Sequence, residues 1–507
     1  MSHLIIAPII LPIAMAAVLL VLERRHDSRL LRIASALGVG ANLLLALGLV
    51  VRTLDGEIVA YLMGDWPGRI GIVLMADRLG SGLVATTALL AIPCLLHAMA
   101  GWDRRALHFH SLFHVQLAGL NGAFLTGDLF NLFVFFEVLL IASYGLLLSG
   151  ARGPRIRAGL HYVVFNVAAS TVFLIALALL YGQLGTLNMA WMAQRIAAFP
   201  PDDAALLIAA GGLLMVVFCA KAALLPLYTW LPAAYSRAPA AVAALFVIMT
   251  KVGLYAVLRV GTLLFGGQAQ WFGTLTWNWL LPAGIVTVCL AALGVMGATR
   301  LRTSIAYLVL ASAGMLFIAF ALQTPAAIAA GLYYLPHSVF VTAALFLLAD
   351  LISRVRGDTG ELLLHVAPIA QKTLLGTLFL VAAVSVAGLP PLSGFIGKLS
   401  LLQAVPEGSL RWVWPAVLFS SLLTIAGLSR VGTRLFWRVD HEAVQADPPA
   451  VRRQEVWAVL LLLGYGVAMT IAAEPILAHA RSTSEQLLQP ESYLHAVQAA
   501  QSIIREP

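Results

Sequence analysis

Long apolar stretches separated by short polar segments run along almost the whole chain. A helix needs about 20 apolar residues to cross a lipid bilayer, and fourteen stretches come close to that length. They cover residues 4–23, 30–52, 75–98, 109–126, 129–148, 158–182, 206–231, 238–264, 279–298, 304–322, 326–353, 370–404, 410–436 and 455–478. The pattern therefore predicts an all-α polytopic membrane protein with about fourteen transmembrane helices.

The composition agrees with this class of protein. Hydrophobic residues make up 61% of the 507 residues and charged residues only 11%, whereas a soluble protein carries about 25% charged residues. The net charge of +8 comes from arginines in short polar segments, which indicates membrane topology rather than a nucleic-acid surface. The chain is apolar from Leu4 onward without a basic start, so we expect a retained first helix rather than a signal peptide.

The basic residues also predict the orientation. The odd-numbered loops hold twenty Lys or Arg residues, among them Arg104, Arg152 and Arg438, against eight in the even-numbered loops and the tail. The positive-inside rule then places the odd-numbered loops in the cytoplasm and both termini outside. The loop at about 437–454 is a polar connector, and the tail from about 479 has a pattern compatible with an amphipathic surface helix.

Two of the stretches are unusually long and contain prolines. One is 206–231, with Pro226, and the other is 370–404, with Pro390 and Pro391. Proline breaks a helix, and the freed backbone groups are tolerated at membrane depth only inside protein or beside water. The two broken helices are the seventh and the twelfth, and a unit of five helices inverts its topology when repeated. This is the inverted-repeat pattern of transporters with discontinuous helices.

The repeat divides the chain into four regions. We expect an N-terminal three-helix region at 1–108, a first repeat of helices 4–8 at 109–278, a second, inverted repeat of helices 9–13 at 279–436, and the cytoplasmic loop, last helix and polar tail at 437–507.

Five ionisable residues lie within the apolar stretches. They are Glu137, Lys221, Lys251, His337 and Lys398. A charged side chain near the bilayer centre costs roughly 3 kcal/mol even on lenient insertion scales, so such residues face the protein interior or internal water. Together they suggest a pathway for protons or cations.

Glu137 and Lys221 suggest a switch, since Lys221 lies five residues before Pro226. A nearby carboxylate favours the protonated form of a lysine. Making and breaking one contact between the two would therefore switch the lysine between holding and releasing a proton. The alternative for Glu137 is a purely structural ion pair between helices.

The other three residues extend the row, and two of them have an alternative. Lys251 would be the next site, or a lysine that reaches to the membrane surface. His337 follows Pro336, and an imidazole titrates near physiological pH, although a lone histidine in a helix is often a hydrogen-bonded core residue. Lys398 would be the terminal site.

Two groups of residues raise the question of a metal site: a cluster of three histidines, and three cysteines that are far apart in the sequence. His108, His110 and His114 lack an accompanying carboxylate or cysteine, so we favour a position at the membrane interface over a metal site. Cys94, Cys219 and Cys289 are far apart in apolar segments, which argues against disulfides, iron–sulfur clusters and structural zinc. No haem or quinone site is indicated.

Four segments resemble one family. They are GDLFNLFVFFEVLLIASY (127–144), KAALLPLYTWLPAAYSRAPAAVAALF (221–246), TKVGLYAVLR (250–259) and AGLPPLSGFIGK (387–398). They resemble the D subunits of the Mrp-type (Pha-type) multisubunit monovalent cation/proton antiporters, which belong with the antiporter-like, proton-translocating subunits of respiratory complex I. The resemblance covers essentially all fourteen predicted helices and is weakest over the first three, the 437–454 loop and the tail.

The resemblance implies a role in proton translocation for each buried ionisable residue. Glu137 corresponds to the glutamate of the fifth helix, Lys221 to the lysine of the broken seventh, Lys251 to the lysine of the eighth, His337 to the histidine of the eleventh and Lys398 to the lysine of the broken twelfth. All five positions carry the residue that the family pattern expects. No bound organic cofactor or metal is implied.

The resemblance further implies a hetero-oligomer with other antiporter subunits in a bacterial inner membrane, where proton influx drives export of Na⁺ or K⁺. One alternative is a proton-pumping membrane subunit of a complex I-like NADH:quinone oxidoreductase or membrane-bound hydrogenase. Another is a scaffold that only holds transporting subunits. The cost of five buried ionisable groups and two broken helices argues against the scaffold.

Overall fold

The computed structural model describes nearly the whole chain. The described residues are 2–25, 28–69, 71–150, 153–266, 270–364, 371–437 and 451–505. Arg152, Arg438 and most of the predicted 437–454 connector lie outside these ranges.

The described chain is almost entirely helical, with a single short hairpin. The strands are β1 (Val59–Leu62) and β2 (Val73–Ala76), which pair antiparallel. The helices are α1 (Ala7–Glu23), α2 (Ser28–Thr53), α3 (Arg78–Ala98), α4 (Phe109–Leu125), α5 (Leu129–Leu148), α6 (Pro154–Leu184), α7 (Met189–Ala197), α8 (Ala205–Lys221), α9 (Trp230–Arg237), α10 (Ala240–Leu264), α11 (Gln270–Gly297), α12 (Leu301–Ala321), α13 (Pro325–Val355), α14 (Lys372–Ala387), α15 (Ser393–Gln403), α16 (Leu410–Gly432), α17 (Arg453–Ile471), α18 (Ala473–Leu488) and α19 (Pro490–Arg505).

Many of these helices have the length and composition of membrane spans. Within the described ranges, ten are long and apolar enough to cross a bilayer. Three further apolar helices, α1, α8 and α14, are shorter. The predicted class, a polytopic all-α membrane protein, is therefore confirmed at this level.

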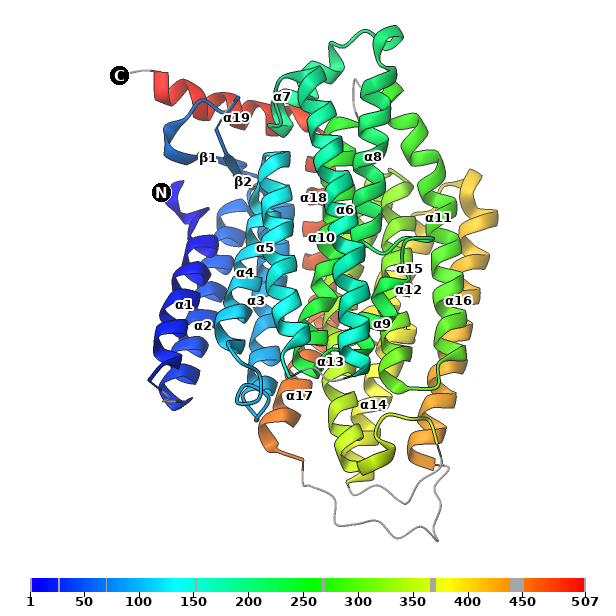
Figure 1. Ribbon diagram of the computed structural model, residues 1–507. Coiled ribbons are helices and arrows are strands. Elements are labelled where there is room, and N and C mark those ends of the chain that lie inside the picture. The colour runs from blue at the N-terminus through cyan, green and yellow to red at the C-terminus, as the bar shows by residue number, and fades with distance from the viewer. Residues whose placement is uncertain are drawn as a thin grey trace.

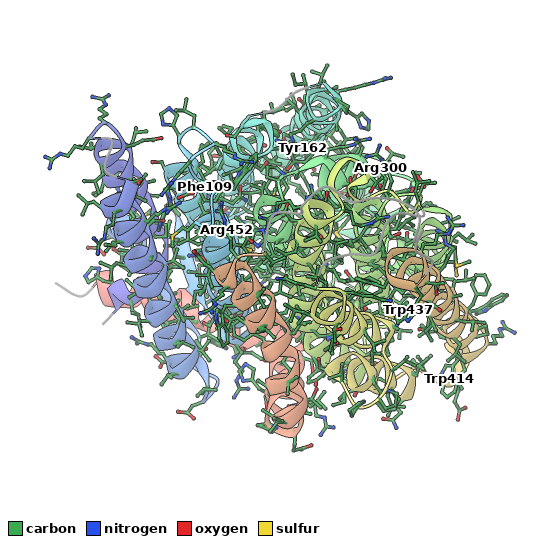
Figure 2. All side chains as sticks on the ribbon, turned by 90° about the horizontal axis from the view of Figure 1, so that it is seen from below. Phe109, Tyr162, Arg300, Trp414, Trp437 and Arg452 are labelled. Atoms are coloured by element: carbon green, nitrogen blue, oxygen red, sulfur yellow. The ribbon has the colours of Figure 1, made fainter. Side chains whose placement is uncertain are left out.

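The helices form one bundle, with segments far apart in the sequence at its two edges. In Figure 1, α1 and α2 lie at one edge and α16 at the other. The view from below in Figure 2 repeats this arrangement, with Trp414 marking α16. All 25 residues of α10 are buried. The helix that carries Lys251 therefore lies in the interior of the protein and not against lipid.

Both predicted helix breaks are present. The first separates α8, which ends at Lys221, from α9, which begins at Trp230. The second separates α14, which ends at Ala387, from α15, which begins at Ser393. These are the segments that contain the prolines, which cannot donate a helical hydrogen bond.

Backbone groups freed at the breaks find partners inside the protein. At the first break, Trp230 Nε1 donates to the Ala220 carbonyl at 3.1 Å and Leu225 N donates to Thr287 Oγ1 at 3.1 Å. At the second, Leu389 N donates to the Val384 carbonyl at 3.1 Å. The breaks thus meet the requirement that irregular backbone at membrane depth be satisfied by protein.

The C-terminal tail is helical, but only its last part lies across the bundle. In Figure 1, α18 runs along the bundle, whereas α19 crosses its upper end near β1 and α7. The α18 side chains of Ala480, Thr483, Ser484 and Leu487 are buried. A surface helix over the whole tail is therefore wrong for α18, because this helix packs against α13 within the bundle.

Candidate functional site

Glu137 and Lys221 are connected through a third residue, Ser170. Glu137 projects from α5, Lys221 is the last residue of α8, and Ser170 lies on α6. The Ser170 hydroxyl donates to Glu137 Oε1 and accepts a hydrogen bond from Lys221 Nζ at 3.0 Å. One hydroxyl therefore joins the carboxylate to the ammonium, in place of the direct pair that the sequence suggests.

Beyond Ser170, Lys221 has mostly apolar surroundings. Its side chain is 4% exposed, and Nζ lies 5.8 Å from the centre of the Phe136 ring. A longer contact of 3.4 Å reaches the Asn166 carbonyl. Because α8 ends here, the lysine sits directly at the first helix break.

Lys251 has a neutral partner. It lies in the middle of α10 and is fully buried, with 0% exposure. Its Nζ donates to Ser312 Oγ of α12 at 2.8 Å, and that hydroxyl donates in turn to the Val309 carbonyl at 2.7 Å. Full burial rules out a lysine that reaches to the membrane surface.

His337 contacts the second helix break. It lies on α13, is 1% exposed, and its Nδ1 is 2.9 Å from the hydroxyl of Ser393, the first residue of α15. Its Nε2 is buried without a hydrogen-bond partner in the described residues. One ring nitrogen is therefore fixed at the break, while the other has no partner in the described protein.

Lys398 spans the same break. It lies on α15, and its Nζ donates to the Ala387 carbonyl at the end of α14 at 2.7 Å and to Ser421 Oγ of α16 at 3.1 Å. Gly388 lies between them with φ +79°, and a Cβ there would come 2.6 Å from Lys398 Cδ. The glycine is thus needed both for the backbone turn and for the lysine stem.

A serine hydroxyl accompanies each of the four bases, of which Lys221, Lys251 and His337 are buried and Lys398 is partly buried. The pairs are Lys221 with Ser170, Lys251 with Ser312, His337 with Ser393 and Lys398 with Ser421. Sequence reasoning missed these serines, because a serine in an apolar helix is common and often bonds its own helix. A hydroxyl both donates and accepts, so it can face either protonation state of its partner.

The five predicted residues thus fall into three groups. Ser170 brings Glu137 and Lys221 together, the second break brings His337 and Lys398 together, and Lys251 lies apart on α10. Among the described residues, none of the three lysines forms a direct ion pair with a carboxylate. This is a row of buried or partly buried bases held mostly by neutral groups.

The three neighbouring histidines each have a different partner. His108 Nδ1 lies 2.7 Å from Glu23 Oε2, His110 Nε2 lies 3.4 Å from Asp103 Oδ2, and His114 Nε2 lies 3.3 Å from Ser35 Oγ. His108 is about half-exposed, while His110 and His114 are buried. The described ranges contain no group of three or more His, Cys, Asp or Glu side chains that could hold a metal ion.

Asp103 lies in the loop between α3 and α4 and pairs with Arg32. Arg32 donates from Nε to Oδ2 at 2.5 Å and from Nη2 to Oδ1 at 2.6 Å. Burial alone would raise the pKa of this carboxyl, but hydrogen bonds from His110 and Arg32 and the Arg32 charge outweigh it, so the pKa falls to about 2.

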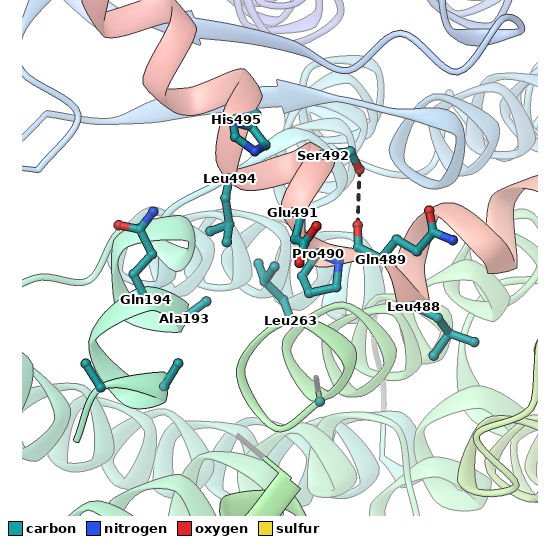
Figure 3. A pocket seen from close by; sticks show the side chains of 13 residues that line it. Ala193, Gln194, Leu263, Leu488, Gln489, Pro490, Glu491, Ser492, Leu494 and His495 are labelled. Carbon is teal, nitrogen blue, oxygen red and sulfur yellow. Dashed lines mark hydrogen bonds between the residues drawn. The ribbon is translucent and has the colours of Figure 1, made fainter. Parts of the chain in front are cut away.

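A cavity of about 850 Å³ lies away from all of these residues. It is enclosed by α7, the end of α10 and the turn from α18 into α19, as Figure 3 shows. Its lining includes Gln194, Leu263, Glu491 and His495, but none of the five ionisable residues predicted from the sequence. The size of a cavity is therefore not what locates the candidate site.

Known proteins resemble this chain over nearly its full length. It is 37% identical to a probable K⁺/H⁺ antiporter D subunit of Rhizobium meliloti, in a match that covers 99% of this chain and 98% of that protein. It is 35% identical to a Na⁺/H⁺ antiporter D subunit of Alkalihalophilus pseudofirmus, over 98% and 99% of the two chains. A chain in the structure of the Mrp complex from Dietzia sp. DQ12-45-1b has a TM-score of 0.87 and 27% identity, over 98% and 99%.

The family match covers the candidate site. Residues 126–424 match the family described as "NADH:quinone oxidoreductase/Mrp antiporter, TM". This range contains Glu137, Lys221, Lys251, His337 and Lys398, and both helix breaks. The chain therefore belongs to the transmembrane family of NADH:quinone oxidoreductase and Mrp antiporter subunits.

Proposed function

We propose that this chain is a subunit of a multisubunit secondary antiporter that exchanges protons for Na⁺ or K⁺. The proposal rests on the antiporter D subunits to which it is 35% and 37% identical over almost the full length. The observation that carries the mechanism is the row of three buried bases and one partly buried base, each in contact with a serine hydroxyl. Such groups are costly within a membrane protein unless they serve a purpose.

The proton path would begin at the Glu137–Ser170–Lys221 group. The negative charge of Glu137 stabilises the ammonium of Lys221, although the two meet only through the Ser170 hydroxyl. Rotation of that hydroxyl away from either partner weakens the stabilisation of the Lys221 ammonium. The lysine then gives up its proton more readily, and the next base in the row accepts it.

Lys251, His337 and Lys398 would form the rest of the path. Their partners in the described residues are neutral hydroxyls and a carbonyl. A buried positive charge with neutral partners is costly, and two such charges close together repel each other. At the second break, which His337 and Lys398 both contact, each base therefore holds a proton only while the other is neutral, and protons move one step at a time.

The membrane arrangement of this proposal has fourteen helices in two inverted five-helix repeats. The similar position of a proline break in α8–α9 and α14–α15 supports the repeat. The excess of arginines in odd-numbered loops supports a cytoplasmic position for those loops. Both labelled ends of the chain lie toward the same end of the bundle in Figure 1, as expected if both termini are periplasmic.

The partners would be other subunits of the antiporter in a bacterial inner membrane. A redox-driven pump remains the second candidate, because the matched family includes NADH:quinone oxidoreductase subunits. The two functions differ in what starts proton movement. An antiporter responds to the cation alone, whereas a redox pump requires an electron donor and acceptor.

The test uses everted vesicles from an antiporter-deficient bacterium that expresses the complete operon. A pH dye follows dissipation of a preformed proton gradient when NaCl or KCl is added. We expect a salt-dependent response from the wild type, and none from assembled Lys221→Ala. Lys372→Ala removes an exposed lysine and serves as the matched control. No response of the wild type to either salt would contradict antiport and favour the redox pump.

A further inference from the structure

A second row of buried polar groups lies between α2 and α4, outside the proton path described above. We call it the α2/α4 seam, and it consists of Arg32, Ser35 and Asn42 on α2 and His110, His114 and Asn121 on α4. On a helix with 3.6 residues per turn, the three α4 residues lie within about 40° of one another. They therefore share one face, along the helices at the edge of the bundle (Figure 1).

The seam begins at the Asp103 loop. Arg32 closes this end through its two hydrogen bonds to Asp103. His110 follows directly, with Nε2 3.4 Å from Asp103 Oδ2 and only 3% of its side chain exposed. The ion pair thus separates the first histidine from the loop surface.

His114 occupies the middle of the seam, one helical turn further along. It is fully buried and its Nε2 lies 3.3 Å from Ser35 Oγ. Gly38 leaves the space for this ring, because a Cβ at that position would come 2.8 Å from His114 Cε1. The absence of a side chain at Gly38 therefore permits an imidazole in the interior.

Two asparagines end the seam. Asn121 Nδ2 donates to the Pro8 carbonyl at 2.7 Å and to Asn42 Oδ1 at 3.1 Å. The Pro8 carbonyl is free for this bond because Pro12, four residues later in α1, has no N–H. Beyond this point α2 presents the buried apolar side chains of Ala46 and Leu49.

Several atoms in the seam have no partner within the described protein. They include Nδ1 of His110, Nδ1 of His114, Nδ2 of Asn42 and Oδ1 of Asn121. The asparagine pair thus offers one free donor and one free acceptor, which a water molecule can satisfy together. Buried polar groups of this kind are normally paired by ordered water.

We propose that the α2/α4 seam is a hydrated proton-binding site, separate from the Glu137–Lys398 row, that responds to pH at the Asp103 end of the bundle. From His110 to Asn121 it is about 16 Å long at 1.5 Å per residue. That is about half the 30 Å thickness of a bilayer core. The seam is closed at Asn42 and Asn121, so it binds protons and does not conduct them across.

The ionisable groups facing the seam are few. They are Arg32, Asp103, His110 and His114. Other charged or imidazole groups on α1, α3 and α5 have partners elsewhere: Glu23 with His108, Arg78 with the Leu54 carbonyl, His97 with Asp350, and Glu137 with Ser170. The two histidines are therefore the groups in the seam that can take up a proton on a ring nitrogen without a protein partner.

The first test measures hydration without relying on transport. Ser35→Cys places a thiol in the seam, and Ala46→Cys places one in the apolar part of the same helix, about three turns away. A small methanethiosulfonate reagent reacts with thiolates, and apolar burial disfavours the thiolate form. In assembled complexes we expect Ser35→Cys to react at least tenfold faster than Ala46→Cys and than the wild type. Equal rates would overturn the proposal.

The second test measures proton binding. His114→Gln keeps a polar side chain but cannot be protonated near neutral pH. We expect the rate of antiport at its optimum to be retained, and the acid limb of its pH profile to shift by roughly half a pH unit or more. An unchanged profile would overturn the proposal, as would loss of activity at every pH. If the proposed antiport itself fails, the thiol rates still decide whether the seam is hydrated.

Discussion

The two broken helices place a lysine on opposite sides of the break. Lys221 ends the segment before the first break, whereas Lys398 lies in the segment after the second. Lys221 shares the Ser170 hydroxyl with the Glu137 carboxylate. Lys398 instead donates to the carbonyl of Ala387, the last residue before its own break. The first site thus depends on a countercharge from another helix, and the second on the backbone of the break itself.

This difference suggests that the two ends of the row stabilise a protonated lysine in different ways. A carboxylate near Lys221 gives that end a fixed negative charge. At the second break, Lys398 contacts only neutral dipoles, the Ala387 carbonyl and the Ser421 hydroxyl. The same break positions His337 through Ser393. Changes to side-chain charge should therefore affect the first site most, and changes to backbone geometry the second.

Among substitutions that keep both lysines, the largest effect is expected from Gly388→Ala. The new Cβ would lie 2.6 Å from Lys398 Cδ, at a position with φ +79°, so both the lysine stem and the backbone must move. We expect antiport to fall more than tenfold, as measured by the initial rate of dye response. Gly212→Ala in α8 is the matched control, because a Cβ there meets nothing within 4 Å. Equal activity of the two variants would contradict the role given to the second break.

Glu137→Gln is expected to have the next largest effect. The amide can still contact Ser170, but it supplies no countercharge for Lys221. We expect roughly a tenfold loss of rate or more, in line with the loss of a positioned acid–base group. The check is the rate across a range of pH values in assembled complexes. A wild-type rate would show that the first site, like the second, works without a carboxylate.

Replacing the serines should lower the antiport rate by different amounts at the two breaks. Ser170 has two charged partners, whereas Ser421 shares Lys398 with a carbonyl. Hydrogen bonds to charged groups contribute about 1.5–3 kcal/mol, so we expect roughly a tenfold loss for Ser170→Ala. We expect only a few-fold loss for Ser421→Ala. The reverse order of rates would contradict the geometry described for the two sites.

The smallest effect concerns stability, at a charged group remote from both breaks. The pKa of Asp103 lies at about 2, below its usual 3.8, so its stabilising contribution is complete above about pH 4 and is lost as pH falls toward 2. Asp103→Asn should therefore lower the free energy of unfolding at pH 7 by roughly 1–2 kcal/mol. Thermal unfolding should differ less between variant and wild type at pH 3. A constant difference at both pH values would exclude this ion pair as the cause.

Much of the site could be predicted because charges stand out in apolar sequence. Glu137, Lys221 and Lys398 were visible for this reason, and Pro226 and Pro390 indicated where the helices break. The chain has only four lysines, and Lys372 is the single one that is not among the five predicted site residues. Residue type alone was enough here, because few purposes explain a lysine at membrane depth.

Other features depended on packing between distant segments. Ser170 resembles any other serine in an apolar helix until α6 is placed beside α5 and α8. The burial of His114 depends on the space left by Gly38 on a different helix. Nothing in the hydrophobic pattern indicated that α18 packs within the bundle. These contacts arise from tertiary structure, which periodicity along one chain does not contain.

The most direct test compares Lys398→Ala with Lys372→Ala in everted vesicles that contain the complete complex. Both variants remove one lysine, but only Lys398 lies in the proposed row and contacts a helix break. We expect cation-dependent proton movement to be abolished in assembled Lys398→Ala and unchanged in Lys372→Ala. A wild-type response from assembled Lys398→Ala would contradict the claim that protons pass along the buried bases.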